Sequence, residues 1–583
     1  MAIDSEVSSE ESTGKSKQLF RLRSIWTAVA VCIFFAVVGW NWLAETDHQI
    51  ANFAAIGLVV LAWVFVLVGV WRNRFLSRWG KLFVSVLPLI VAGVFSCFYE
   101  YTGVSGEVLP QFRLRAAFRA AKVVRPQRPD VGGNATVSDA IKGLRFTQYL
   151  GNERDGKVVD ESFSVAWDQA MPRELWRRDI GAGWSGVSIA QGLAVTLEQL
   201  GDEEAVTALR VEDGETQWQV RRPGRHFHPL GGLGPRSTPT LVERHGQWYA
   251  VALTATGRLI CVVLETGEVL WERSLLEITG ITQEEFEKGV FWGRSASPLV
   301  VGERVIVPVG GSKDGADRIT LMACLLEDGS VLWKSGNRQV SYASPMLLRL
   351  DGVEQIVSVN EGVVTGHSLE DGRELWETPW HSKSDADACA SQPVQVGGDK
   401  ILFGKGYAQG SKLVRVRRGE TSDEGEKVSG STRWRVEDIW VNARVLKTKL
   451  TSAIYDEGRL YALSDGILEC VDAEKGDRVW RGGRYGQGQL LFVNGALLIL
   501  SEDGRIVLAD KETGKVVAQR EVLEGTTWNT FAIAGAFLIV RNVTQVVCLK
   551  SEVGAGSGSL GLGAVDGGVF DGGVAGGKTQ GGE

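Results

Sequence analysis

The sequence predicts an all-β fold, an eight-bladed β-propeller of four-stranded antiparallel blades, preceded by an α-helical transmembrane region. Three observations predict it. A turn of an acidic residue and glycine, followed by tryptophan, recurs at roughly the 40–60 residue spacing of a propeller blade. Between these turns, Val, Leu, Ile and Tyr alternate with polar residues, as in antiparallel strands. The first hundred residues instead hold three long apolar runs.

The recurring turn is best seen in "LETGEVLW", Leu264 to Trp271, and it returns in "VEDGETQW", "LEDGSVLW", "LEDGRELW" and "AEKGDRVW". Glycine permits the positive φ of a tight hairpin, and a tryptophan four residues later can pack between neighbouring sheets. We expect these residues to dock one blade onto the next. The expected docking residues are Gly214, Trp218, Gly267, Trp271, Gly329, Trp333, Gly372, Trp376, Trp434, Gly476, Trp480 and Trp176.

Counting from each opening motif to its tryptophan gives the blade number. The units are 183–218, 236–271, 294–333, 342–376, 390–434, 450–480, 488–518 and 528–550; the seventh keeps the turn but ends at Ala518, without the tryptophan. The last unit stops before any tryptophan, whereas "RELWRRDI" (Arg173–Ile180) supplies an orphan strand ahead of the first. Joining the two would remove the exposed sheet edges. An open row of β-repeats is the less economical alternative.

The apolar runs predict three membrane-spanning helices, Ser24–Ala44, Ile50–Trp71 and Leu82–Phe98, each about one bilayer thick. Basic residues precede the first run and fill the loop between the second and third, so the positive-inside rule places everything after Phe98 across the membrane. The basic stretch "QFRLRAAFRAAK" opposes this assignment. If one run does not span, the large domain is cytoplasmic.

These features divide the chain into a cytoplasmic tail (1–23), three transmembrane helices (24–101), a linker (102–160), the propeller (161–550) and a disordered glycine-rich tail (551–583). The linker is expected to hold a short amphipathic helix around "FRLRAAFRAAKVV". The expected location is the inner cell membrane, multi-pass, with the propeller in a periplasm-like space. A net charge of −7 gives no indication of nucleic-acid binding.

Four further segments carry a family resemblance: "FTQYLGNERDG" (Phe146–Gly156), "GAGWSG" (Gly181–Gly186), "GLGPRSTPT" (Gly232–Thr240) and "RYGQGQLL" (Arg484–Leu491). With the aligned turns, the chain from Arg145 to Lys550 resembles the pyrroloquinoline-quinone (PQQ)-like, tryptophan-docking propellers. The membrane-anchored PQQ-binding-like repeat proteins of planctomycete-type bacteria are the nearest match. BamB-type assembly proteins and quinoprotein dehydrogenases are more distant. The resemblance implies the eight-bladed fold and says little about activity.

The resemblance raises the question of a cofactor, because quinoprotein dehydrogenases hold PQQ with calcium, an Asp base and a vicinal Cys–Cys pair. This sequence has no Cys–Cys pair, and no calcium ligand set can be carried over residue by residue. The close histidines His226 and His228 lack an evident third ligand, and "SKDGAD" (Ser312–Asp317) lacks the remaining ligands of a calcium loop. We therefore expect no catalytic residue, no metal and no cofactor, with PQQ and calcium as the alternative.

The residues that open each unit do not repeat, and they precede the innermost strands, so they should form the rim of a funnel on the propeller axis. The candidate binding residues are Trp184, Ser185, Arg236, Ser237, Arg294, Ser295, Tyr342, Ser344, Gln392, Thr451, Ser452, Trp528 and Asn529. Arg236 and Arg294 are the best candidates for contact with an anion or a peptide carboxylate. The competing interpretation is that these Ser and Thr side chains only bond backbone groups near a crowded axis.

The sequence thus predicts a membrane-anchored, non-catalytic binding or assembly platform on the outer side of the inner membrane. Its expected partner is another protein or a peptide at the propeller face. The alternatives are a PQQ-dependent dehydrogenase or quinone-linked sensor, and a carbohydrate or peptide binder that uses the rim aromatics.

Overall fold

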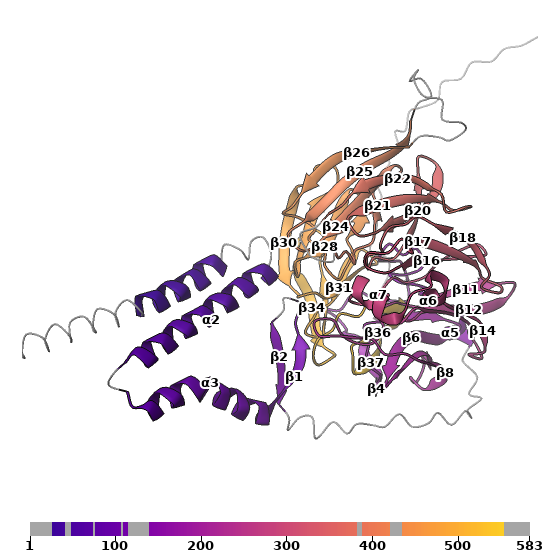
Figure 1. Cartoon of the computed structure of the whole chain (residues 1–583). Coiled ribbons are helices and arrows are strands. Elements are labelled where there is room, and N and C mark those ends of the chain that lie inside the picture. Colours follow the sequence, from indigo (N-terminus) through magenta and orange to yellow (C-terminus); the bar gives the residue numbers. More distant parts are fainter. Residues whose placement is uncertain are drawn as a thin grey trace, which may run out of the picture.

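The computed structural model describes residues 26–40, 48–73, 76–106, 109–114, 139–381, 387–419 and 434–552. The predicted cytoplasmic tail, residues 553–583 of the predicted disordered tail, and most of the predicted amphipathic helix lie outside these ranges. The described chain forms an N-terminal helical part and a large β domain (Figure 1).

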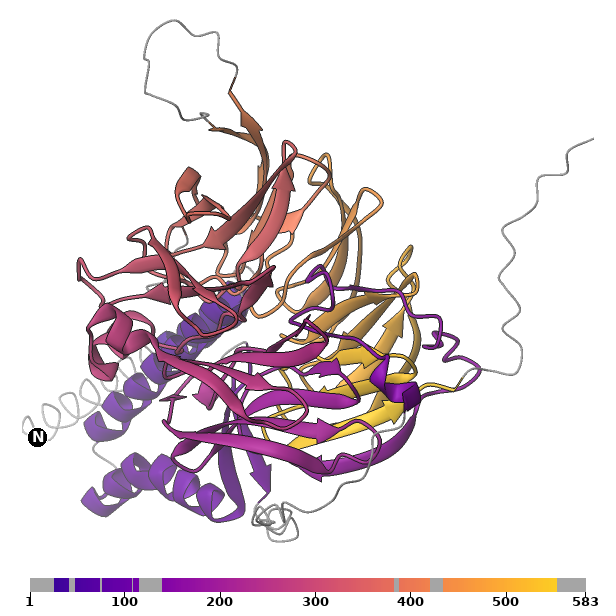
Figure 2. The same ribbon diagram turned by 90° about the vertical axis from the view of Figure 1, so that its right-hand side faces the viewer.

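The β domain is an eight-bladed propeller, as predicted, whose four-stranded antiparallel sheets follow one another around an axis (Figure 2). The first four blades contain β5 (Ser188–Ala190), β6 (Leu193–Leu200), β7 (Glu203–Arg210) and β8 (Thr216–Pro223); β11 (Thr240–Arg244), β12 (Gln247–Leu253), β13 (Arg258–Val263) and β14 (Val269–Ser274); β15 (Leu299–Val301), β16 (Arg304–Gly310), β17 (Ile319–Leu325) and β18 (Val331–Ser335); and β19 (Met346–Leu350), β20 (Val353–Val359), β21 (Val363–Ser368) and β22 (Glu374–Pro379).

The last four blades differ in length but keep the same order. They contain β23 (Val394–Gln395), β24 (Lys400–Lys405), β25 (Gly410–Arg418) and β26 (Trp434–Asn442); β27 (Ile454–Asp456), β28 (Arg459–Ser464), β29 (Ile467–Asp472) and β30 (Arg478–Arg484); β31 (Gln489–Val493), β32 (Ala496–Leu500), β33 (Arg505–Ala509) and β34 (Val516–Glu521); and β35 (Ala532–Ala534), β36 (Phe537–Arg541) and β37 (Gln545–Lys550), completed by β4 (Arg173–Asp179).

The eighth blade closes the ring with strands from both ends of the domain. β4 pairs antiparallel with β37, with Trp176 opposite Cys548. Arg541 at the end of β36 is fully buried and joins this blade to the first, since its guanidinium donates to the Thr196 hydroxyl (2.6 Å) and the Leu197 carbonyl (2.9 Å). The predicted closure is confirmed: β4 covers the edge of β37 and gives the last blade its fourth strand.

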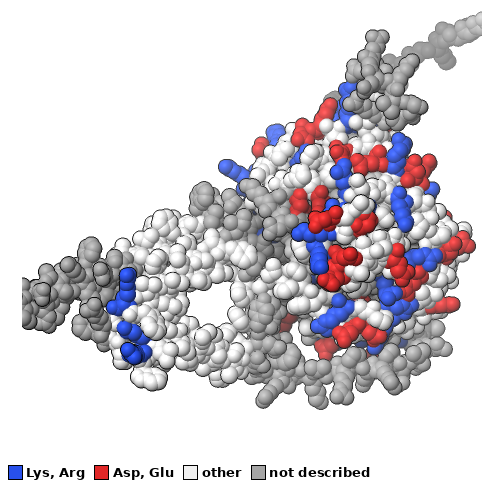
Figure 3. All heavy atoms as spheres, viewed as in Figure 1, with Lys and Arg blue, Asp and Glu red and all other residues white. Residues whose placement is uncertain are grey.

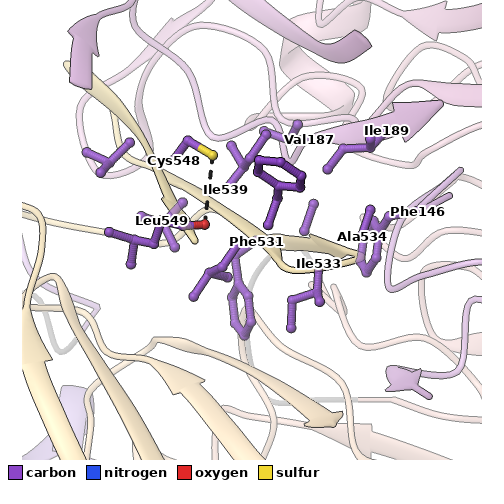
Figure 4. Packing of buried hydrophobic residues seen from close by; sticks show 14 of the residues in the cluster. Phe146, Val187, Ile189, Phe531, Ile533, Ala534, Ile539, Cys548 and Leu549 are labelled. Atoms are coloured by element: carbon purple, nitrogen blue, oxygen red, sulfur yellow. Dashed lines mark hydrogen bonds between the residues drawn. The ribbon is translucent and has the colours of Figure 1, made fainter. Parts of the chain in front are cut away.

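The hydrophobic core is a ring of layers between adjacent blades. Middle strands are buried on both faces, whereas outer strands such as β8 alternate between buried and exposed positions. The largest layer surrounds the closing blade, where Phe146 and Ile189 pack against Phe531, Ile533 and neighbouring residues (Figure 4). Most of the apolar burial that stabilises the fold is therefore made between sheets, not within one.

Tryptophans on the outer strands dock onto glycines of the following blade. Trp218 illustrates the geometry: its indole N–H donates to the Leu264 carbonyl at 2.6 Å, and its ring covers Gly267, whose φ is +75°. The same packing joins six pairs: Trp176 and Gly214, Trp218 and Gly267, Trp271 and Gly329, Trp333 and Gly372, Trp440 and Gly476, and Trp480 and Gly514.

Two expected docking residues behave differently. In every blade a β-bulge follows the residue that faces the docking position, as between Cys261 (opposite Trp271) and Val262. In the fifth blade Trp440, not the expected Trp434, stands at this position opposite Leu413. Trp434 lies earlier on β26, opposite Arg418.

Trp376 holds the docking position of the fourth blade but packs on Gly366 of its own sheet. Its indole N–H donates to the Gln355 side chain at 2.7 Å. The seventh blade has Ala518 at the docking position. Among the residues that the structure describes, the junctions after these two blades show no tryptophan-on-glycine contact.

The N-terminal part contains an apolar helix, Trp26–Trp40, followed by α2 (His48–Arg72) and α3 (Arg78–Phe98). α2 and α3 are long and apolar enough to cross a membrane, whereas Trp26–Trp40 is shorter than the predicted run. After α3, β1 (Tyr99–Val104) and β2 (Pro110–Leu114) form a hairpin that lies between the helices and the propeller (Figure 1). The remaining elements are α5 (Asp139–Lys142), β3 (Lys157–Val158), β9 (Phe227–His228), β10 (Gly232–Leu233), α6 (Leu275–Thr279) and α7 (Gln283–Gly289).

Candidate functional site: an aromatic funnel

A cavity of about 610 Å³ lies where the segments ahead of the innermost strands converge. This volume is within the range of about 300–1,000 Å³ typical of ligand pockets. Its wall is mainly aromatic, and we call the cavity and this wall the funnel. The aromatic residues contributed by the propeller domain are Tyr149, Trp184, Phe291, Trp292, Tyr342, Tyr407 and Trp528.

The membrane-side part of the chain forms a lid over the funnel. Val104, Ser105 and Gly106, at the tip of the β1–β2 hairpin, line the cavity, as does Phe53 near the start of α2. The Gly106 N–H donates to the Glu502 carboxylate at 2.5 Å. The funnel therefore opens toward the apolar helices.

The segment from Phe146 to Asp160 forms the floor. Phe146 exchanges backbone hydrogen bonds with Ile189 of the first blade, and Lys157–Val158 pairs with β31 of the seventh. Between these points the Arg154 guanidinium donates to the Pro298 carbonyl (2.8 Å), and Tyr149 lines the cavity. Burial raises the pKa of the Tyr149 phenol. Residues 102–160, predicted as a linker, thus supply both lid and floor within their described part.

Two aromatic pairs shape the wall. Trp184 and Trp528 lie with ring centroids 4.5 Å apart, and Trp292 and Tyr342 lie 5.0 Å apart. The Trp184 indole donates to the Gly231 carbonyl at 2.6 Å, and the Trp528 indole to Glu502 at 3.1 Å. These bonds fix the rings, so their faces form a preorganised apolar surface.

Cations occupy one side of this wall. Arg236 lines the funnel and donates to the carbonyls of Gly231 (2.6 Å) and Gly234 (3.2 Å). Burial lowers the pKa of Arg236 to about 10, which leaves it charged at neutral pH. His228 accepts a hydrogen bond from the Trp292 indole (3.1 Å), and burial lowers its pKa.

A second cation lies across the funnel. The Lys449 ammonium is 2.9 Å from the Asp465 carboxylate, and Lys447 is 3.7 Å from the same carboxylate. All three side chains are buried, and Lys449 also lines the cavity.

The structure separates the predicted rim into two groups. Six residues line the cavity: Trp184, Arg236, Ser295, Tyr342, Ser344 and Trp528. Seven lie buried behind it: Ser185, Ser237, Arg294, Gln392, Thr451, Ser452 and Asn529. Among these, Ser185 accepts the Leu197 N–H, and Asn529 donates to the carbonyls of Gly183 and Ser185, as expected if they bond backbone groups.

Arg294 does not reach the funnel. Its guanidinium carbon lies 3.6 Å from the centre of the Phe286 ring, on α7, and one nitrogen donates to the Val309 carbonyl. Burial lowers the pKa of Arg294 to about 9. The expectation that it contacts an anion alongside Arg236 is therefore wrong, because the α6–α7 insertion covers it.

Several lining residues were not among the predicted rim. Phe291 and Trp292 precede Arg294 in "FWGRSASP", so the opening motif read three residues further back would have found them. Leu230 and Tyr407 sit on loops without a repeat signal. The lid has no local signal. The floor contains "FTQYLGNERDG", which carries the family resemblance, but its place at the funnel follows from long-range contacts.

The residues that line the cavity do not supply the ligand set of a calcium ion. Calcium takes six to eight oxygen ligands, carboxylates above all, whereas no Asp or Glu lines the cavity among the described residues. Within the same residues no group of three His, Cys, Asp or Glu could hold a metal. His226 and His228 acquire no third ligand, and Asp317 accepts hydrogen bonds from Ser312 in its own turn.

Comparison with known proteins agrees with the fold. The family model described as "Outer membrane protein assembly factor BamB" matches residues 158–287, 246–433 and 424–567. A protein of that name from Shewanella oneidensis is 20% identical over 60% of this chain and 81% of its own length. One from Alkalilimnicola ehrlichii is 28% identical over 36% of this chain and half of its own length.

Among solved structures, BamB from Moraxella catarrhalis aligns with a TM-score of 0.43 and 13% identity, covering 65% of this chain and 100% of its own. The nearer kinship with planctomycete-type proteins stays a prediction. Because the family model matches most of the propeller, and with it more than half of the sequence, the chain belongs to the family described as outer membrane protein assembly factor BamB.

Proposed function

We propose that this protein is a membrane-anchored, non-catalytic platform that binds a partner protein at the funnel, on the outer side of the cell membrane. The observation that carries the proposal is the position of the funnel: a concave aromatic surface that faces the membrane-side segments and is lined by them. Membership of a family named for outer membrane protein assembly supports a role in protein assembly.

Membrane anchoring is supported by α2 and α3. Most of their side chains are apolar and exposed, as lipid-facing side chains would be. Arg72, Arg78 and Lys81 lie at the helix ends away from the propeller, where Figure 3 shows basic residues on an otherwise uncharged surface. Basic loops favour the cytoplasmic side, so the propeller belongs on the opposite side.

Partner binding is supported by the chemistry of the funnel. Tryptophan, tyrosine and arginine dominate the energetic centres of protein interfaces. The two aromatic side chains bury much surface with few freely rotating bonds, and the arginine guanidinium offers several hydrogen-bond donors. Here Trp184, Trp292, Tyr342 and Arg236 converge on one cavity. Tryptophan rings held by hydrogen bonds lose little further freedom on binding, which favours affinity.

Photocrosslinking in the membrane tests the platform. A photoreactive phenylalanine analogue at Phe291, which lines the funnel and is 37% exposed, should form adducts with a partner protein. The matched control is Val517, 45% exposed on β34 of the seventh blade. Adducts from Phe291 alone support the proposal, whereas the same adducts from both positions, or none from either, contradict it.

Sidedness has its own test. Cys97 is the exposed cysteine among the described residues, so it is first replaced by serine. In this Cys97→Ser background, Val517→Cys should react with a membrane-impermeant maleimide in spheroplasts, because the propeller is proposed to lie outside the cell membrane. Labelling only after lysis would place the propeller in the cytoplasm. The enzymatic alternative predicts a quinone absorbance band and dye-linked alcohol oxidation after titration with PQQ and calcium; we expect neither.

A further inference from the structure

The β1–β2 hairpin inserts a tight polypeptide turn into the mouth of the funnel. Its turn is closed by Ser105, whose backbone N–H donates to the Leu109 carbonyl (2.9 Å) and whose hydroxyl accepts the Leu109 N–H (3.2 Å). Gly106 meets the propeller at the side chains of Gln487 and Glu502. A methyl group on Gly106 would overlap the Gln487 side chain, so the fit requires glycine.

Glu502 receives this tip. It lies beyond the end of β32 and is only 8% exposed. Its carboxylate accepts the backbone N–H groups of Gly106 (2.5 Å) and Gln487 (2.9 Å) and the Trp528 indole N–H (3.1 Å). A buried carboxylate makes strong, charge-assisted bonds to such donors. The mouth of the funnel is therefore built to recognise a peptide N–H.

Gln487 adds the complementary amide chemistry. Its side chain is 1% exposed and lines the cavity directly beneath Gly106. Both its Oε1 and Nε2 atoms have no hydrogen-bond partner in the described part of the chain. Leaving a buried donor and acceptor unpaired destabilises the folded chain. One donor and one acceptor in a single amide match the carbonyl and N–H of a polypeptide backbone.

The hairpin is held from its other end. Tyr99 stacks on Phe95 of α3 with ring centroids 4.3 Å apart, and Phe112 packs edge-on against the same ring at 4.9 Å. A two-stranded ribbon is only marginally stable by itself. The tip leaves a cavity of about 610 Å³ between itself and the floor. A larger turn could therefore enter further than the hairpin does.

We propose that the Val104–Gly106 tip is a tethered occupant of a polypeptide-binding site, and that the site's external ligand is a glycine-tipped turn of the partner protein, which displaces the hairpin. The inference rests on the proposed function. The partner turn donates a backbone N–H to Glu502, pairs a peptide group with Gln487 and places apolar side chains against Trp184 and Trp528. The carboxylate at the mouth disfavours an anionic lipid headgroup there.

The test uses the full-length chain in detergent micelles and a fluorescein-labelled peptide with the sequence of residues 99–114, "YEYTGVSGEVLPQFRL". A tethered competitor acts at millimolar effective concentration. The wild-type chain should therefore bind the peptide at least tenfold more weakly than a Gly106→Ala chain, whose own tip no longer fits. Gly93→Ala on α3, where a methyl group meets open space, is the matched control and should behave as wild type.

Two further changes define the site. Glu502→Ala in the Gly106→Ala chain should weaken peptide binding at least tenfold, and a peptide carrying the Gly106→Ala change should not bind. In a Ser105→Cys, Cys97→Ser chain, added wild-type peptide should accelerate alkylation of the new cysteine by releasing the tip. Far-ultraviolet circular dichroism checks that each variant folds.

Equal peptide affinity of the wild-type and Gly106→Ala chains, or an alkylation rate that the peptide leaves unchanged, would overturn the inference. An anionic-lipid ligand would appear instead as peptide-independent displacement of the tip by phosphatidylglycerol vesicles, which also overturns it. If peptide binding fails while Phe291 still crosslinks a partner, this inference falls and the proposed function stands. If the peptide binds but Phe291 forms no crosslink, the proposed function falls and the peptide-binding site at the funnel mouth stands.

Discussion

The outer ring of the propeller and its funnel use tryptophan in opposite ways. On the outer ring, Trp218 and Trp271 occupy equivalent positions and make equivalent contacts, with indole-to-carbonyl distances of 2.6 and 2.7 Å into the next blade. In the funnel, Trp184 and Trp528 also precede equivalent strands, but one bonds a backbone carbonyl and the other a carboxylate. Contacts that repeat from blade to blade stabilise the fold. The funnel residues do not repeat, so their surface can be specific for one partner.

Unpaired polar atoms show the same division. Buried side-chain atoms without a hydrogen-bond partner, among the described residues, include several near the axis: Ser237 Oγ, Thr451 Oγ1, both amide atoms of Gln487, Gln489 Oε1 and Asn529 Oδ1. On the outer ring, four of the six docked tryptophans donate their indole N–H to a carbonyl of the next blade: Trp176, Trp218, Trp271 and Trp440. The buried Trp333 indole N–H, by contrast, has no partner among the described residues. Since unpaired buried groups destabilise a fold, the outer ring offsets what the funnel loses.

Replacing a docking tryptophan should have the largest effect on stability. Trp271→Ala removes a buried ring and its bond to the Leu326 carbonyl, and should lower the free energy of unfolding by about 3–5 kcal/mol. Guanidinium denaturation followed by circular dichroism measures it. Trp434→Ala is the control, because this partly buried tryptophan does not dock on a glycine. A loss for Trp434 as large as that for Trp271 would contradict the assignment.

A docking glycine has two roles, the positive φ of its turn and the space it leaves for the tryptophan ring, and the two can be measured separately. Gly267→Ala places a methyl carbon 2.6 Å from the Trp218 ring, in addition to forcing alanine to a φ of +75°. Gly246→Ala meets only the conformational penalty, because its φ is +80° but its surroundings are open. We expect a loss of about 1–2 kcal/mol for Gly246 and a further 1–3 kcal/mol for Gly267. Thermal unfolding of both variants decides whether docking adds to the turn.

Beneath the funnel wall, His226 should make stability depend on pH. Burial, with the charges of Arg236 and His228, lowers the pKa of His226 to about 3, and Glu287 lies 3.8 Å away. The unfolded chain binds the proton near pH 6.5, whereas the folded chain excludes it until about pH 3. Stability is therefore full above pH 6.5 and falls as the pH decreases.

Between pH 6.5 and 4.5 the wild type should lose about 2 kcal/mol more than His226→Leu does. Denaturant midpoints across this range measure the difference. Parallel curves for the two proteins would show that the folded state accepts the proton, and with it that the wall is more open than its geometry indicates.

The smallest stability effect is expected in the funnel itself. Trp184→Phe keeps an aromatic ring but loses the bond to the Gly231 carbonyl, so the free energy of unfolding should fall by about 1 kcal/mol or less. Crosslinking from Phe291 should nevertheless decrease, because the wall changes shape. A large loss of stability with unchanged crosslinking would assign Trp184 to the structural ring.

A contact of this fold can be predicted from the sequence when it repeats from blade to blade. The docking pattern and the closing strand with Trp176 follow from spacing alone. Spacing misleads at Trp434, because the polar insertion "GETSDEGEKVSG" lengthens the fifth unit and the first tryptophan after it is taken for the docking one. The bulge opposite Trp440 settles the register, but a bulge leaves no fixed mark in sequence.

Only part of the funnel can be predicted from the sequence, because only some of its residues lie at repeating positions. Trp184, Arg236 and Trp528 open their units, and the strand order brings these positions together. The burial of Arg294 depends on the insertion α6–α7, whose Phe286 covers the guanidinium. The lid and floor come from a segment whose composition is that of a connection. Their positions arise from contacts such as Gly106 with Glu502, between residues far apart in sequence.

The closure of the eighth blade also sets the order in which the molecule can be completed. Arg177 and Gln545 are bonded neighbours in the finished sheet, yet 368 positions separate them in the chain. During synthesis β4 emerges before the seven complete blades and waits, with an unpaired edge, for the last strands to arrive. The ring therefore closes only when the final residues pair with β4. Until then, every intermediate exposes the edge of β4 that β37 later covers.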